Sequence, residues 1–173
     1  MQFKIVSENT QKIVDLYQLS RNINFDSEIL LFDKKEVSLG LLSHKSIVYI
    51  ALNFVDFAIK TYSDIYPKEA ISCVNLARKW LSDKNSISKE EIKTVVSFSI
   101  SNSNISNRSS SNINYAAIYA CYTTYHSQAV SYAIDVANSV ASAAFNKDEE
   151  FIRQGEFILD YLKSGLYLFH LEK

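Results

Sequence analysis

The chain has 173 residues, 47% of them hydrophobic and 21% charged, and its formal net charge is −1. This length and composition are those of one globular domain with a buried core, which excludes a disordered chain and argues against a second domain. A chain so close to neutral has no excess of basic residues to attract a phosphate backbone, so we expect no nucleic acid partner.

The scarcity of glycine and proline decides the predicted fold class. The sequence contains 3 Gly and 1 Pro. β-Sandwiches and barrels need many tight turns, in which glycine supplies positive φ angles, whereas helices joined by loops of Ser, Asn and Asp need neither residue often. We therefore predict an all-α fold, a single compact bundle of about six to eight helices over residues 1–173. Residues 2–6 are expected as a short extended arm or strand ahead of the first helix.

The first three helices are predicted from the spacing of apolar residues and from one N-cap. Apolar residues recur at roughly helical spacing over about 10–20, and a shorter helical segment follows over 26–32. Ser43 is the expected N-cap of a third helix that extends to about residue 66. One stripe of this helix should face the core. It consists of Val48, Leu52, Val55 and Ile59.

Two further helix starts are marked by local signals. Pro67 fits the first turn of a helix over 67–82, because its missing N–H donor loses no hydrogen bond there. Ser88 followed by Glu91 is a capping box, which predicts that the fifth helix starts at Lys89. The core-facing stripe of the fourth helix consists of Ala70, Val74, Ala77 and Leu81.

Serine and asparagine dominate the segment 100–112. Their side chains offer the backbone local hydrogen-bond partners that compete with helical ones. We therefore predict a flexible loop over these residues, and interpret it as a solvated connector rather than as a binding segment.

The segment 113–145 is rich in alanine and is predicted to form two packing helices with a break near 124–128. Small residues that recur every fourth position allow another helix to approach closely. The two ladders are Ala116, Ala120 and Thr124, and Ala133, Ala137 and Ala141. A last helix should follow Asn146, which with Glu149 resembles a second capping box.

Two features of the sequence predict the cellular compartment of the protein. They are the setting of its two cysteines and the lack of an apolar leader in its first residues. Cys73 and Cys121 both lie in apolar helical patterns, where a thiol usually behaves as a small buried hydrophobe, so we expect free structural thiols in a reducing cytosol. The first ten residues lack the apolar run of a signal peptide, and no stretch approaches the ~18 apolar residues of a membrane helix. We predict a cytoplasmic protein that does not contact a membrane.

No motif in the sequence predicts a metal site, a cofactor or catalysis. Neither His-Glu-x-x-His nor Glu-x-x-His occurs, and the isolated glycines form neither a nucleophile elbow nor a phosphate-binding loop. Asp56 is expected to pair with Lys60, one helical turn away. Asp135 lies on a polar helix face, and a role as general base is the less favoured interpretation of it.

Four polar aromatic residues are the best candidates for a binding surface. Tyr115, Tyr119, Tyr122 and His126 recur at i, i+4, i+7 and i+11, which in a continuous helix gives one row about 16 Å long. Tyrosine rings supply contact area and their hydroxyls supply hydrogen bonds, so this row is the predicted partner-binding surface. The interpretation that the sequence itself favours is that the rings lie at the boundary of the core with their hydroxyls in water.

The order of helices over 46–145 carries a family resemblance. A Pro-x-x-Ala-Ile helix that ends in Arg-x-Trp-Leu precedes a short acidic turn and Ala-rich helices. The matching residues are Pro67, Ala70, Ile71, Arg78, Trp80 and Leu81. This order resembles the Imm-five-like helical domain of immunity proteins in bacterial polymorphic toxin systems. That family often carries histidines in its Ala-rich helix, at places that align with Gln128, Ile134 and Asn138, so the role of those histidines is not carried over.

The resemblance implies a cytoplasmic protein that binds a toxin and neutralises it by occlusion, without catalysis. Two alternatives stay open. One is a phage- or plasmid-borne inhibitor of a host defence system, and the other is a helical enzyme or small-molecule sensor whose site lies between helices. The sequence gives neither the identity of a partner nor the oligomeric state.

Overall fold

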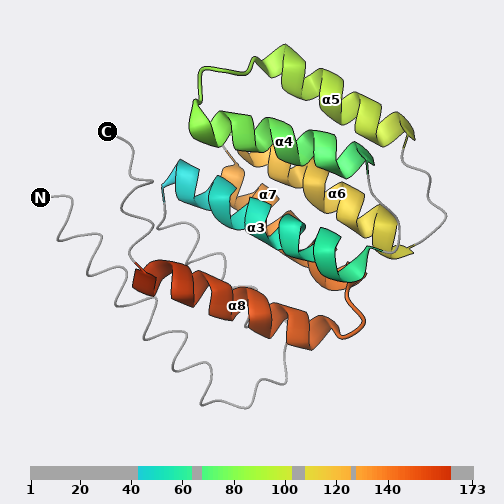
Figure 1. The fold of residues 1–173 in the computed structure, drawn as a ribbon, viewed down its shortest axis with the longest axis vertical. Coiled ribbons are helices and arrows are strands. Elements are labelled where there is room, and N and C mark those ends of the chain that lie inside the picture. The colour runs from blue at the N-terminus through green and yellow to red at the C-terminus, as the bar shows by residue number, and fades with distance from the viewer. Residues whose placement is uncertain (1–42, 64–67, 103–107, 126–127, 165–173) are drawn as a thin grey trace, which may run out of the picture.

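The computed structural model describes residues 43–63, 68–102, 108–125 and 128–164, and these residues form six α-helices and no strand (Figure 1). The all-α prediction is confirmed. The extended arm predicted over 2–6 and the helices predicted over 10–20 and 26–32 lie outside the described residues. The helices are α3 (His44–Tyr62), α4 (Lys68–Ser82), α5 (Lys89–Asn102), α6 (Arg108–Thr123), α7 (Ala129–Ala143) and α8 (Lys147–Ser164).

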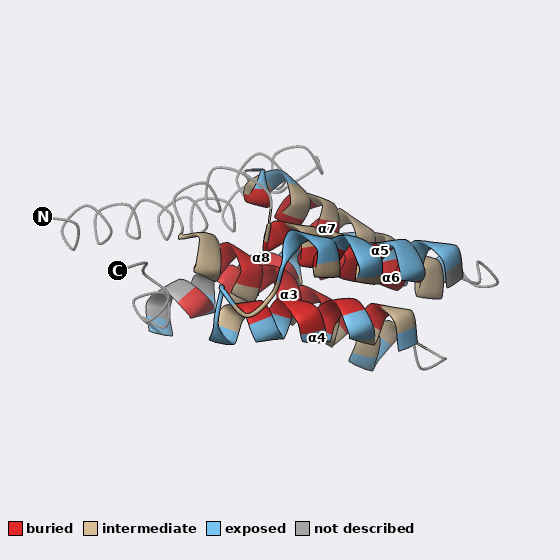
Figure 2. Cartoon of the chain, turned by 90° about the horizontal axis from the view of Figure 1, so that it is seen from above, coloured by how far each residue is buried: buried red, intermediate tan, exposed pale blue. Residues whose placement is uncertain are grey.

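The helices pack around α3, which contacts α4, α6 and α7. Helices α6 and α7 lie behind α4 and α3 in the view of Figure 1, and they make the most extensive contact of any pair of described helices. Helix α5 packs on α4 and α6 at one edge, and α8 packs on α7 at the other. Helices α3 and α4 form one layer, and α6 and α7 form the other (Figure 1). The buried faces of these helices point inward between the two layers (Figure 2).

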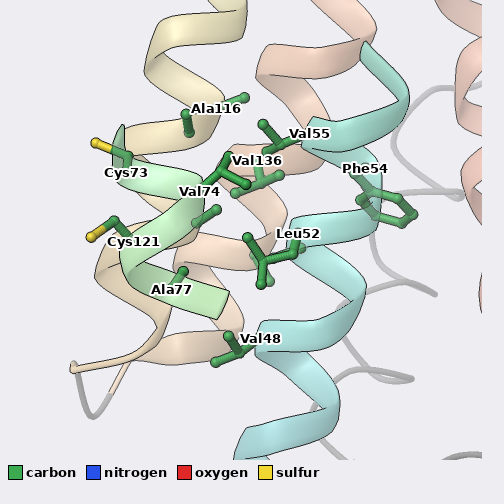
Figure 3. Packing of buried hydrophobic residues seen from close by; sticks show 14 of the residues in the cluster. Val48, Leu52, Phe54, Val55, Cys73, Val74, Ala77, Ala116, Cys121 and Val136 are labelled. Carbon is green, nitrogen blue, oxygen red and sulfur yellow. The ribbon is translucent and has the colours of Figure 1, made fainter. Parts of the chain in front are cut away.

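Most residues of the apolar stripes predicted from spacing lie in the core, whereas Ile59 and Leu81 are partly buried at its edge. Val48, Leu52 and Val55 are at most 3% exposed. They meet Val74 of α4 and Val136 of α7 in the space between the helices (Figure 3). Burying a Val or Leu side chain stabilises the fold by ~1.5–3 kcal/mol, so these contacts supply a large part of the stability of the bundle.

The alanine ladders explain why α6 and α7 lie so close together. Each ladder presents methyl groups in place of longer side chains, so the two backbones can approach without a clash. All six ladder residues are at most 3% exposed: Ala116, Ala120, Thr124, Ala133, Ala137 and Ala141. The predicted break is also confirmed, because α6 ends at Thr123 and α7 begins at Ala129.

Three helix starts follow the predicted caps. The Ser43 hydroxyl accepts a hydrogen bond from the backbone N–H of Ser46 at 3.2 Å. The Ser88 hydroxyl accepts one from Glu91 at 3.1 Å, and α5 starts at Lys89 as predicted. The Asn146 side chain accepts hydrogen bonds from the first turn of α8 at 3.2 and 3.3 Å. Each cap satisfies donors that a helix N-terminus leaves without a partner.

The loop predicted over 100–112 is too long. Helix α5 continues to Asn102 and α6 begins at Arg108, so the loop prediction is wrong at both ends, and 103–107 lie outside the described residues. Two polar side chains near the start of α6 bind the backbone of α7 instead of that of their own helix. Asn112 and Ser109 donate hydrogen bonds to carbonyl oxygens at the end of α7, each at 3.0 Å. Tertiary contact thus removes the local competition that the prediction assumed.

A buried polar cluster fixes α8 to α3. Glu150 is only 2% exposed, yet its carboxylate accepts hydrogen bonds from Arg153 at 2.7 and 2.5 Å, from Tyr62 of α3 at 2.7 Å and from Gln154 at 2.9 Å. The Arg153 guanidinium also lies 3.5 Å from the ring centre of Phe57. Every oxygen of this buried carboxylate therefore has a donor, as a buried charge requires.

Candidate functional site

The candidate site lies on the hairpin formed by α6 and α7, whose helices run antiparallel. At one end, Asn112 of α6 donates a hydrogen bond to the Ser142 carbonyl of α7. At the other end, the rings of Tyr122 and Tyr132 lie with their centres 5.3 Å apart. This register places Tyr119 opposite the middle of α7, close to Asp135.

Three of the four residues in the predicted row lie within the described part of the chain. Tyr115 is 44% exposed, whereas Tyr119 and Tyr122 are half-buried and pack against the edge of the core. The core-boundary interpretation therefore applies to two of the rings, and Tyr115 alone is largely in solvent. His126 lies outside the described residues.

Tyr132 joins this row from α7, although helical spacing along the sequence does not predict that it does. Its ring lies 6.2 Å from the ring of Tyr119 with an interplanar angle of 26°, and 5.3 Å from the ring of Tyr122 with an angle of 34°. Both arrangements are within the range of favourable aromatic pairs. Four residues, Tyr115, Tyr119, Tyr122 and Tyr132, are called the tyrosine face below.

The tyrosine face extends toward the start of α5 through a cation–π contact. The ammonium group of Lys89 lies 5.0 Å from the ring centre of Tyr125, which follows the end of α6. A lysine over an aromatic ring gains electrostatic energy from the negative face of that ring. The rings of this hairpin thus already accept one cation within the molecule.

Two hydroxyl groups of the tyrosine face, those of Tyr119 and Tyr122, have raised pKa values. Burial raises the pKa of the Tyr119 hydroxyl above its ordinary value, and the nearby charge of Asp135 raises it further. Burial and the neighbouring Tyr132 also raise the pKa of Tyr122. The hydroxyls can therefore donate hydrogen bonds to a partner.

Asp135 is a half-buried carboxylate beside the tyrosine face. It follows Tyr132 by three residues, which places the two side chains on the same side of α7. Burial raises the pKa of its carboxyl group above the ordinary value. No side chain in the described part of the chain forms a hydrogen bond or an ion pair with it. It is therefore partly desolvated without the compensation that a charge partner provides.

The structure corrects the predicted partner of Asp56. The one-turn spacing suggested Lys60, but both carboxylate oxygens of Asp56 accept hydrogen bonds from Arg78 of α4 at 2.6 Å. Both hydrogen bonds come from the Nη2 nitrogen of Arg78, and this charge-assisted contact between helices takes the place of the predicted local pair with Lys60. Asp56 and Arg78 thus link α3 to α4.

Two residues that carry the family resemblance have structural contacts. Arg78 forms the ion pair with Asp56, and Trp80 is 6% exposed. The Trp80 ring lies 4.8 Å from the ring of His44, whose Nε2 is hydrogen-bonded to the Thr123 carbonyl at 2.5 Å. This chain of contacts connects the start of α3 with the ends of α4 and α6.

Both cysteines are free and buried, as predicted. The thiol of Cys73 lies 3.2 Å from the Ser99 hydroxyl. Two effects raise the pKa of the Cys121 thiol above its ordinary value. The larger effect is a hydrogen bond with Cys73, and the smaller effect is burial. A thiol with a raised pKa and no exposure is a poor nucleophile, so Cys121 is part of the core rather than a reactive site.

Two kinds of feature are absent from the ranges 43–63, 68–102, 108–125 and 128–164. These ranges contain no group of three or more His, Cys, Asp or Glu side chains placed to hold a metal ion. None of their helices is both long enough and apolar enough to span a bilayer.

Comparisons with protein-family models, curated proteins and solved structures found no match to this chain.

Proposed function

We propose that this chain is a protein-binding protein whose tyrosine face contacts a toxin or another effector and neutralises it by occlusion, without catalysis. The observation that carries the proposal is the alignment of four tyrosines along one side of the α6–α7 hairpin, with Tyr115 44% exposed. Tyrosine is enriched among the residues that dominate binding energy at protein interfaces.

The scaffold behind the tyrosine face supports this proposal. The alanine ladders hold α6 and α7 in close contact, so the rings stand on a rigid support. The rings also contact one another, which restricts their rotamers before a partner arrives. A surface ordered in advance loses less conformational entropy on binding than a mobile one.

The resemblance of residues 46–145 to immunity proteins gives the class of partner. An immunity protein acts by binding alone, and a row of aromatic side chains on a rigid hairpin fits that task. A phage- or plasmid-borne inhibitor of a defence system would need the same kind of surface, so the identity of the neighbouring genes separates these two partners.

A protection assay tests the proposal. The chain is expressed in bacteria together with the toxin encoded beside its gene, and survival is compared with an empty vector. We expect survival to rise by orders of magnitude, and Tyr119→Ala and Tyr122→Ala each to weaken toxin binding by ~1 kcal/mol or more. Phe145→Ala is the matched control, because Phe145 is fully exposed in the connection between α7 and α8. Survival no better than with the vector contradicts the proposal.

A further inference from the structure

Asp135 lacks the basic partner that three other carboxylates of the bundle have. Asp56 pairs with Arg78, Glu91 lies 3.4 Å from Lys79, and Glu150 pairs with Arg153. Asp135 is half-buried like Asp56, but no cation of the described residues reaches it. Its charge is thus the one on the tyrosine face that a partner can complement.

The hairpin itself supplies almost no positive charge. Helix α7 contains no Lys, Arg or His, and α6 contains one basic residue, Arg108, at its first position. Arg108 precedes Tyr115 by seven residues, which is about 10 Å along a helix, and Asp135 lies farther along still, opposite Tyr119. The cation of Lys89 already lies over the ring of Tyr125. None of the basic residues in the described part of the chain is therefore placed to pair with Asp135, and a partner molecule can supply the missing cation.

The surroundings of Asp135 select a guanidinium group over an ammonium group. Tyr119 lies near enough for its hydroxyl to respond to the Asp135 charge, and Tyr132 precedes Asp135 by one turn of α7. A planar, weakly hydrated guanidinium stacks on aromatic rings while it donates two parallel hydrogen bonds to a carboxylate. An ammonium ion keeps its hydration more tightly and loses more on entering a partly desolvated site. The half-buried position also weakens the screening by water that makes exposed ion pairs so weak.

We propose that an arginine side chain of the protein partner docks on the tyrosine face, with its guanidinium group stacked on Tyr119 and paired with the carboxylate of Asp135. Tyr115, one turn from Tyr119 and more exposed, contacts the same arginine from the solvent side. This inference rests on the proposed function, because it specifies which chemistry of the partner the face recognises.

A pair of peptides that differ only in charge tests this proposal. The full chain is titrated with acetyl-Gly-Arg-Gly-amide and with acetyl-Gly-citrulline-Gly-amide, in which a neutral urea group replaces the guanidinium. The NMR signals of the Tyr119 ring and the Asp135 amide report binding. We expect saturable shifts at both residues with the arginine peptide, and affinity lower by about fivefold or more with citrulline.

Two variants locate the effect. In Asp135→Asn the arginine peptide should bind no better than the citrulline peptide, whereas Asp160→Asn, which removes an exposed carboxylate of α8 and changes the net charge equally, should leave the difference intact. Equal binding of both peptides to the unaltered chain overturns the proposal, and so does the absence of any shift at Tyr119.

Other occupants of the site give different results. If a cation of this chain holds Asp135, Asp135→Asn lowers Tm by several degrees, and if a second copy holds it, Asp135→Asn abolishes self-association seen on light scattering. Either result overturns the proposal.

If the toxin binds the Asp135→Asn chain as tightly as the unaltered chain, the arginine inference fails while the proposed function stands. If no toxin is neutralised yet the arginine peptide binds selectively, the proposed function fails alone.

Discussion

Glu150 of α8 and Asp135 of α7 lie on neighbouring helices in opposite electrostatic surroundings. Glu150 is 2% exposed and accepts hydrogen bonds from Arg153, Tyr62 and Gln154. Burial alone would raise the pKa of Glu150, but these hydrogen bonds and the Arg153 charge lower it below the ordinary value. Asp135 is less buried and has no such donors, so burial leaves its pKa raised.

The carboxylate of Glu150 stabilises the fold, whereas the carboxylate of Asp135 has no hydrogen-bond or ion-pair partner in the described part of the chain and can bind another molecule. The Glu150 cluster joins α8 to α3, and its members are satisfied by one another. Asp135 joins no helices, and its position beside Tyr132 and Tyr119 gives it an aromatic environment instead. Structural charges are expected to affect stability when they are removed, and binding charges are expected to affect affinity.

Removal of the Glu150 carboxylate should have the largest effect on stability. Glu150→Ala leaves Arg153, Gln154 and Tyr62 without their shared acceptor in a buried site, so we expect the free energy of unfolding to fall by ~3–5 kcal/mol. Urea denaturation followed by circular dichroism measures this loss. Glu149→Ala, at an exposed position one residue earlier, should cost less than ~1 kcal/mol. Equal losses in the two variants would show that the cluster does not hold α8.

Acid should weaken the Glu150 cluster next. The folded-state pKa of Glu150 lies below its ordinary value of 4.5, so its contribution to stability is fully present above that pH and is lost as the pH falls through the folded-state pKa. Stability differences between the unaltered chain and Glu150→Gln, measured at pH 7, 5 and 3, should therefore shrink only between pH 5 and 3. A difference independent of pH would contradict this assignment.

Neutralisation of Asp135 should have the smallest effect on stability, and of the opposite sign. Its folded-state pKa lies above its ordinary value of 3.8, so its charged form is disfavoured by folding at neutral pH. Asp135→Asn should leave the free energy of unfolding at pH 7 unchanged or raise it by up to ~0.5 kcal/mol. Any gain should shrink as the pH falls below the raised pKa and disappear below 3.8, where the carboxyl is protonated in both states. A loss above 1 kcal/mol at pH 7 would mean that Asp135 has a structural partner.

Features that depend on neighbouring residues in the sequence were predictable. The caps at Ser43, Ser88 and Asn146 and the break between α6 and α7 follow from side chains within one turn of the backbone that they affect. The stripe of α3 follows in the same way, because helical periodicity fixes which residues share a face.

Features that depend on tertiary contact were not predictable. Arg78 comes from another helix to pair with Asp56, and Tyr132 completes the tyrosine face from α7. The first turn of α6 is helical because Ser109 and Asn112 find acceptors on α7. None of these partners lies within one turn of the residue that it binds, so periodicity carries no signal of them.

The central claim, that the tyrosine face is the binding surface, is tested most directly by calorimetric titration with the purified toxin. Because two interface tyrosines contribute ~1 kcal/mol or more each, we expect the double variant Tyr115→Ala–Tyr119→Ala to bind at least about thirtyfold more weakly than the unaltered chain. We expect Phe145→Ala to bind within about twofold of the unaltered chain, as surface residues outside an interface do. An unchanged affinity of the double variant, with its helical content intact, would contradict the account.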